Sequence, residues 1–220
     1  MAELDDRDLV WHGTDRVELK DFLLPMGAIV PYPPPRARQE WTAYLGMVIF
    51  LGSWAMMFGS LFFAYGMVRA RTTAWPPPDL PELPLALPGV NTAVLAASSV
   101  ILQLGVRWLR VGKMTLVGPA LATSFALGGL FLSLQMVTWR SLFDEGLTPS
   151  GGPYPSVFYA LTCFHALHVL VGIGALAWLC HGVFVGKYSA ARFLPVRLWT
   201  LYWHFVGAVW GVMFVTVYLL

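Results

Sequence analysis

Charged residues are scarce in this chain of 220 residues, and their scarcity excludes most soluble folds. Asp, Glu, Lys and Arg make up 12% of the sequence, whereas a soluble domain typically carries about 25%. Hydrophobic residues make up 57% and aromatic residues 15%. The net charge of +2 is spread between apolar segments and forms no single patch, so nucleic acid is not an expected partner. This composition predicts a protein of the lipid bilayer.

Acidic residues are absent from all of the long apolar segments. Of the twelve Asp and Glu residues, eight precede Trp41 and the others lie between apolar segments, at Asp79, Glu82, Asp144 and Glu145. A proton pump or cation-coupled transporter usually needs a carboxylate near the middle of the membrane. The sequence therefore disfavours both of these classes.

Motifs for independent chemistry are also missing. The two cysteines, Cys163 and Cys180, lie about 25 Å apart if they share one straight helix, which is too far for a disulfide. The sequence contains no phosphate-binding glycine loop, no cysteine pair at metal-binding spacing and no nucleophile with a base at helical spacing. We therefore expect no catalytic centre in this chain.

Five segments are long and apolar enough to cross the membrane, for which a helix needs about 20 residues. The predicted spans are residues 42–68, 91–109, 116–139, 156–183 and 197–219. Proline-rich segments separate the first span from the second and precede the fourth. The predicted fold is an all-α, five-transmembrane-helix bundle over residues 41–220. Residues 1–40 form a proline-rich arm, which is either a strap that docks on another subunit or a disordered tail.

The distribution of basic residues between the two sides of the predicted bundle sets its orientation. Eleven Lys and Arg residues fall in the N-terminal arm and in the second and fourth loops, against three in the first and third loops. Because basic loops are retained on the cytoplasmic side, we expect a cytoplasmic N-terminus and a periplasmic C-terminus.

Histidine is the remaining candidate for chemistry within the spans. His165 and His168 are three residues apart and share one helical face, while His204 lies in the last span. Buried imidazoles commonly bind haem or copper, or they hydrogen-bond to neighbouring helices. Two histidines at this spacing cannot lie on opposite sides of a haem, and this favours the structural interpretation. Gln135 is expected to form hydrogen bonds between helices.

Four local patterns, in order along the chain, carry a family resemblance. They are Trp-Pro-Pro-Pro at residues 75–78 followed by Pro-Gly-Val-Asn-Thr at 88–92, Leu-Gln at 134–135, Phe-His-Ala-Leu-His-Val at 164–169 with Gly172, and Tyr-Trp-His-Phe-Val at 202–206. Together they resemble subunit III of the cytochrome c oxidases, which are haem-copper respiratory oxidases. Family members commonly have seven spans, and this chain is similar to the shorter five-helix form.

The resemblance implies a subunit without a redox centre, multi-pass in the bacterial inner (plasma) membrane. It would pack against haem-copper subunit I, together with subunit II and other respiratory subunits, bind phospholipid, and support proton uptake and stability of the oxidase. Haem and copper are expected in those partner subunits and no cofactor in this chain. Possible lipid-binding or structural polar residues are His165, His168, His204, Arg192, Arg197 and Gln135. The alternatives are a subunit of a quinol oxidase or nitric oxide reductase complex, or a bis-histidine membrane cytochrome.

Three positions depart from the family pattern, and all three remove a carboxylate. Trp54 follows Ser53 where the family usually places a membrane-buried Glu. Thr138 stands where a Glu is common, and Gly207 stands where an Asp follows the Trp-His-Phe-Val segment. No role that depends on those carboxylates is expected here.

Overall fold

The computed structural model describes residues 9–12, 15–18, 35–72, 75, 77, 80–81, 83–189 and 192–220, with side chains from residue 38 onward. The chain divides into two compact units, Met1–Glu40 and Trp41–Leu220. In the first unit, strands β1 (Leu9–His12) and β2 (Asp15–Glu18) pair antiparallel, with Leu9 opposite Glu18. This short hairpin was not predicted from the sequence. The proline-rich stretch at residues 31–34, on which the prediction of an extended arm rests, lies outside the described residues.

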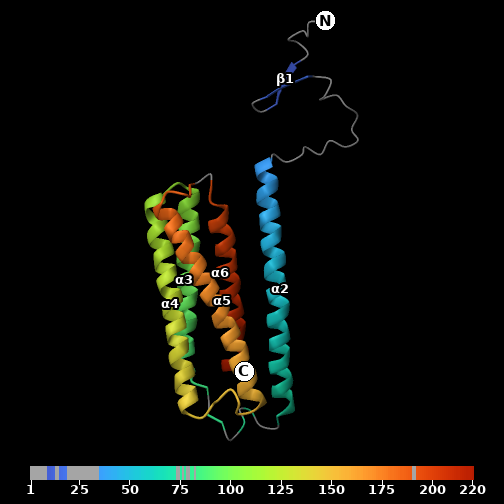
Figure 1. Ribbon diagram of the computed structural model, residues 1–220, viewed down its shortest axis with the longest axis vertical. Helices are drawn as coiled ribbons and strands as arrows, with labels where there is room; N and C mark the ends of the chain where they lie inside the picture. The colour runs from blue at the N-terminus through green and yellow to red at the C-terminus, as the bar shows by residue number, and fades with distance from the viewer. Residues whose placement is uncertain are drawn as a thin grey trace. The chain divides into compact units, whose positions relative to one another are not determined.

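Five long helices follow and confirm the predicted five-helix membrane bundle. They are α2 (Pro35–Arg71), α3 (Ala86–Arg110), α4 (Met114–Asp144), α5 (Pro153–Phe184) and α6 (Leu194–Met213), and α6 continues into a π-helical turn, η2 (Phe214–Leu219) (Figure 1). Each has the length and apolar composition needed to cross a membrane. The chain is therefore a multi-pass membrane protein.

The helices start earlier than the proline pattern predicted. α3 begins at Ala86, where the sequence predicted residue 91, and α5 begins at Pro153, where it predicted residue 156. Pro88 and Pro155 therefore lie within first turns. The backbone N–H groups of a first turn have no partner in the helix, so proline costs little there. Proline marks the start of these helices and does not exclude them.

Helices α3, α4, α5 and α6 form a four-helix core in which the neighbouring pairs are α3–α4, α4–α5, α5–α6 and α3–α6. Helix α2 approaches them less closely (Figure 1). Only 11% of the most apolar 18-residue segment of α2 is buried, whereas the corresponding share is 33–44% in the other four helices. Its three fully buried residues, Leu51, Phe58 and Tyr65, lie seven apart. Half-buried residues three or four positions before or after these, and Tyr44 one turn before Met47, lie on the same side of α2. Together they form one row of side chains, which we call the α2 seam: Tyr44, Met47, Leu51, Trp54, Phe58, Leu61, Tyr65 and Val68. Helix α2 is thus attached along one narrow stripe.

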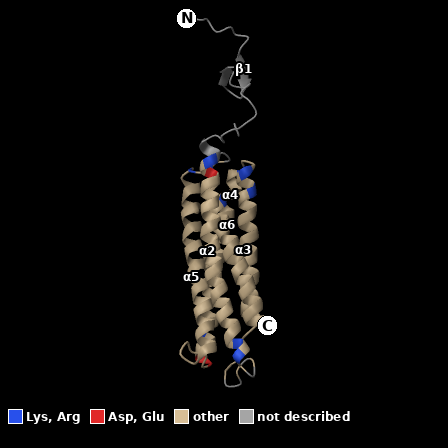
Figure 2. Cartoon of the chain, turned by 90° about the vertical axis from the view of Figure 1, so that its right-hand side faces the viewer, with Lys and Arg blue, Asp and Glu red and all other residues tan. Residues whose placement is uncertain are grey.

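The charged groups of the bundle gather at its two ends, and a long uncharged band separates them (Figure 2). We call one end the basic end, because the loops there and the adjoining helix ends carry six cations: Arg107, Arg110, Lys113, Lys187, Arg192 and Arg197. The opposite end carries Arg69, Arg71 and Arg140 together with Asp144 and Glu145. This division follows the basic-residue asymmetry of the sequence.

The centre of the bundle is occupied by the indole of Trp203, which is 1% exposed. A β-carbon built on Gly128 of α4 would lie 2.7 Å from this ring, and one built on Gly172 of α5 would lie 2.8 Å from it. The indole N–H donates to Ser98 Oγ of α3 at 2.9 Å. Glycine is therefore required on two helices so that one side chain of α6 can touch the other three helices of the core.

Replacing Gly172 by Ala should destabilise the bundle, because the added methyl group would overlap a ring that has no space to move. Overpacking of this kind typically costs about 1–3 kcal/mol, which would appear as a lower midpoint of thermal unfolding in detergent. Gly174→Ala is the matched control, since its β-carbon would meet no atom within 4 Å. Equal stability of the two variants would show that the Trp203 packing is not tight.

Candidate functional site

His168 projects from α5 into the aromatic row of the α2 seam. Its ring lies 4.2 Å from that of Trp54 and 5.2 Å from that of Phe58, measured between ring centroids. Its Nδ1 is 2.7 Å from the carbonyl oxygen of Phe164, one turn earlier on α5. The main-chain carbonyl of His168 also accepts a hydrogen bond from the hydroxyl of Tyr202 at 3.0 Å. His168 therefore helps to join α5 to both α2 and α6.

His165 lies one turn away and is 1% exposed. Its imidazole is surrounded by the rings of Phe58, Phe131 and Trp210, at centroid distances of 6.2, 5.9 and 5.4 Å. Neither ring nitrogen has a hydrogen-bond partner within the described residues. An imidazole in these surroundings acts as a flat, ring-shaped packing element between three helices.

His204 lies apart from this pair, on the side of α6 that faces α3. Its Nε2 is 3.0 Å from Oε1 of Gln103, and both side chains are half-buried. His165, His168 and His204 therefore do not converge on one point. Among the residues that the structure describes, no three His, Cys, Asp or Glu side chains come close enough together to hold a metal ion.

Gln135 forms part of a second polar cluster in the core, towards the end opposite the basic end. It is 1% exposed, and its Oε1 accepts a long hydrogen bond of 3.4 Å from Nδ2 of Asn91, which is fully buried. The buried hydroxyl of Tyr218 has no hydrogen-bond partner within the described residues. Asn91 Oδ1 and Gln135 Nε2 have no partner within the described residues. The interaction links α3 to α4 as predicted for polar groups between helices.

Arg192 and Arg197 lie at the basic end, and both are exposed. The guanidinium of Arg197 stands 5.3 Å from the ring centroid of Tyr44 on α2, while the main chain of Arg192 pairs with that of Ser189 in the loop before α6. Tyr188 in the same loop is buried, and burial raises the pKa of its hydroxyl. The loop thus keeps an uncharged phenol inside and directs its cations outward.

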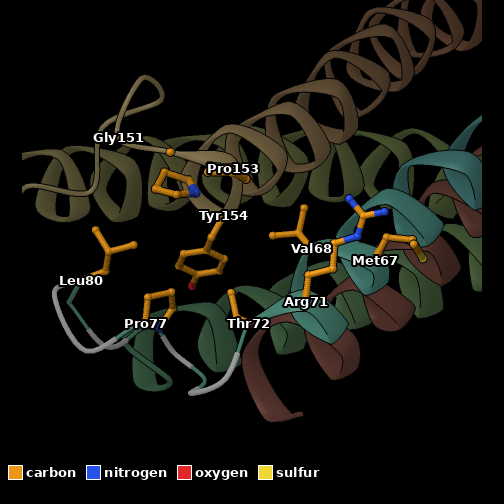
Figure 3. A pocket seen from close by; sticks show the side chains of 11 residues that line it. Met67, Val68, Arg71, Thr72, Pro77, Leu80, Gly151, Pro153 and Tyr154 are labelled. Carbon is orange, nitrogen blue, oxygen red and sulfur yellow. The ribbon is translucent and has the colours of Figure 1, made fainter.

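The opposite end contains a cavity of about 530 Å³ between the end of α2 and the start of α5 (Figure 3). Figure 3 shows Tyr154 at its centre, Arg71 and Val68 on the α2 side, and Leu80 on the side of the loop after α2. The ring of Tyr154 also packs edge-on against Trp75 at 4.7 Å. The described lining is mainly apolar with one cation, so the cavity suits an amphipathic molecule better than a polar substrate.

Comparison with known proteins identifies the family. The family model for cytochrome c oxidase subunit III matches residues 40–220. This chain belongs to the cytochrome c oxidase subunit III family.

Three curated relatives illustrate the extent of the similarity. The chain is 39% identical to cytochrome c oxidase subunit 3 of Synechocystis sp. over 176 residues, which is 80% of this chain and 74% of that protein. It is 36% identical to a probable cytochrome c oxidase subunit 3 of Nocardia farcinica and 32% identical to cytochrome c oxidase subunit 3 of Thermostichus vulcanus, and it covers 86% of each. These matches comprise 79% and 80% of this chain.

Within this cytochrome c oxidase subunit III fold, the three positions that depart from the family pattern are buried or half-buried. Trp54 covers the ring of His168. Thr138 is buried and donates to the carbonyl of Leu134, one turn earlier. Gly207 lies beside Ser99, whose hydroxyl would be 3.3 Å from an added β-carbon. Uncharged residues packed inside the fold therefore stand at the three positions where the family pattern has a carboxylate.

Sequence reasoning missed Gln103, the partner of His204, although a Gln inside an apolar span is as visible there as at Gln135. It also treated Asn91 only as the start of a span, because the sequence placed the helix boundary at that residue. The signal for both was an amide inside an apolar run, but the partners could not be known before the helices were positioned. Only the structure therefore pairs Gln103 with His204 and Asn91 with Gln135.

We predict that His165→Phe is tolerated, because a phenyl ring of similar shape would replace an imidazole that makes no hydrogen bond within the described residues. Its unfolding free energy should stay within about 1 kcal/mol of the parent protein. Gln135→Leu is the contrasting variant, since it leaves the Asn91 amide unpaired and should cost about 1–3 kcal/mol. Thermal unfolding of the purified protein measures both changes. A loss for His165→Phe as large as that for Gln135→Leu would mean that the imidazole has a polar partner.

Proposed function

We propose that this chain is a non-catalytic subunit III that packs on haem-copper subunit I within a terminal oxidase of the bacterial plasma membrane. Family membership over residues 40–220 is the observation that carries the proposal, and it makes the chain a component of a cytochrome c oxidase complex with other subunits. Reduction of oxygen would occur in the partner subunits, which would hold the haem and copper. This chain would support the stability of the oxidase and proton uptake by it.

The chemistry of the helices supports a role without a redox centre. Residues 41–71, 86–110, 114–143, 153–184 and 194–220 contain no Asp or Glu, so these segments offer no carboxylate to carry a proton or bind a cation. The His165 and His168 rings are enclosed by aromatic side chains. His204 lies elsewhere, between α6 and α3, where it pairs with Gln103. The contribution to proton uptake would therefore be indirect, through the shape and stability of the partner.

The surface supports a scaffold that is covered by lipid and by other subunits. Large apolar side chains are widely exposed along α2, including Met56 at 78% and Phe63 at 71%. In water such a surface would aggregate, whereas in the bilayer it is matched by acyl chains or by partner helices. The basic end would face the cytoplasm under the positive-inside rule. There Arg192 and Arg197 would contact phospholipid phosphates.

Two alternatives differ in the partner or in the cofactor. In a quinol oxidase or a nitric oxide reductase complex the same scaffold role would hold with a different electron donor or acceptor. The three relatives are all known as cytochrome c oxidase subunit 3 or probable cytochrome c oxidase subunit 3, and this favours the cytochrome c oxidase. A bis-histidine membrane cytochrome would require two facing imidazoles on one haem, whereas His204 is paired with Gln103 on a separate face.

The decisive experiment purifies the tagged chain from its native membranes in mild detergent. We expect a haem-copper subunit in the eluate, a haem spectrum from the complex, and neither haem nor copper on the chain after dissociation. A chain in which His165 and His168 are both replaced by Phe, with His204 retained, should give a complex with the same haem content. Stoichiometric haem on the isolated parent chain would refute the proposal and support the membrane cytochrome. Oxygen consumption with reduced cytochrome c or with a quinol then separates the remaining two possibilities.

A further inference from the structure

The outer face between α3 and α6 carries a groove that the four-helix core leaves open. Two hollows, of about 330 and 350 Å³, lie along these helices, and Ser99 and His204 line both. They are therefore parts of one continuous groove, which we call the α3–α6 groove. It runs from Gly211 of α6 to Arg107 of α3, which lies near the basic end.

The groove holds a polar pair at a depth where lipid offers no hydrogen bonds. His204 lies ten residues from the start of α6, and Gln103 lies four residues before Arg107, so along their helices the two side chains are about 6–15 Å from the basic end, inside the hydrocarbon core and on its basic side. If its Nε2 donates to Gln103 Oε1, then the lone pair on its Nδ1 and both N–H groups of the Gln103 amide remain available. No partner for these groups is found within the described residues. The pair could therefore bind a second polar group from outside.

Three serines on outward-facing positions are satisfied within their own helices. Ser53, Ser60 and Ser133 each donate to the carbonyl oxygen four residues earlier in their own helix, at 3.0–3.1 Å. A hydroxyl satisfied in this way can face acyl chains at little cost. The imidazole–amide pair presents both a donor and an acceptor that no local carbonyl satisfies, so contact with lipid alone would leave them unpaired.

The floor of the groove is built from small residues, namely Ala96, Gly207, Ala208 and Gly211. Packing within this chain explains Gly207, whose β-carbon would lie 3.3 Å from Ser99 Oγ. It does not explain Gly211, where an added β-carbon would meet nothing within 4 Å. A floor of this kind lets another helix backbone approach closely, which is how membrane helices associate.

We propose that the α3–α6 groove receives a transmembrane helix of the haem-copper catalytic subunit, and that a hydrogen-bonding side chain on that helix pairs with His204 and Gln103. The inference rests on the proposed function and adds the docking face and its polar anchor. An acyl chain could fill the hollow but could not pair with these groups at this depth. Arg107 at one end of the groove would meet an acidic or phosphate group where the partner helix leaves the membrane.

Site-specific photocrosslinking in the intact complex tests the docking face. A photoreactive residue is placed at Ala208, which is exposed in the groove, and the matched control is placed at Val137, which lines a hollow of about 390 Å³ between α4 and α5. We expect irradiation of the complex to link position 208, and not position 137, to the catalytic subunit. Crosslinks from 208 only to lipid or to a second copy of this chain, or crosslinks to the catalytic subunit only from 137, would overturn the inference.

Substitutions test the polar anchor and the floor separately. His204→Leu should lower the recovery of the catalytic subunit with the tagged chain by up to about tenfold, the effect of losing one strong interhelical hydrogen bond, while His204→Gln should retain most of it. Gly211→Leu should reduce recovery by filling the groove. Its control is Gly129→Leu on α4, another glycine with open space around it. Unchanged recovery of the catalytic subunit with both His204→Leu and Gly211→Leu would refute the proposal that its helix docks in the α3–α6 groove.

The two levels of the hypothesis fail in different ways. If the unmodified tagged chain brings down no haem-copper subunit, the proposed function itself is wrong. If that subunit is recovered but crosslinks and substitutions point to another face, only the docking inference is wrong. Thermal unfolding of each variant chain, compared with the parent, shows that a loss of recovery reflects docking and not misfolding.

Discussion

The indole of Trp203 is the interaction on which the bundle depends. Its ring lies against the backbones of Gly128 on α4 and Gly172 on α5, and its N–H donates to Ser98 on α3. One side chain of α6 thereby fixes the distances to three other helices. In a bilayer, where the hydrophobic effect does not draw helices together, close packing and interhelical hydrogen bonds must supply the attraction, and this residue supplies both.

The polar groups of the core follow from the same constraint. Ser98 and Ser124 exchange hydrogen bonds with each other's carbonyl oxygens between α3 and α4, at 3.4 and 3.1 Å. Tyr202, next to Trp203, ties α6 to the main chain of α5 at His168. Neutral hydroxyls, amides and indoles therefore contribute to the attraction between helices that the hydrophobic effect supplies in a soluble protein. A bundle joined in this way is consistent with a structural subunit beside a redox partner.

Much of this arrangement could be predicted from the sequence, because its strongest signals are local. Long segments without acidic residues give the five spans, and the family motifs cluster around the residues that pack most tightly, among them Gly172, His168 and Trp203. The pairing of His204 with Gln103 could not be predicted, since it joins residues 101 positions apart and depends on which faces of α3 and α6 meet. The helix starts were misjudged because proline is compatible with a first turn as well as with a loop.

The attachment of α2 through the α2 seam has a consequence for biogenesis. Helix α2 leaves the ribosome first, yet its aromatic contacts are made mainly with α5, whose residues are synthesised about a hundred positions later. Before α5 is inserted, the α2 seam has no aromatic partner on α5, and α2 lies in the lipid without these contacts. The core helices α3 to α6 can close around Trp203 independently of it. Helix α2 can therefore take up its place in the folded bundle only after α5 has been inserted into the membrane.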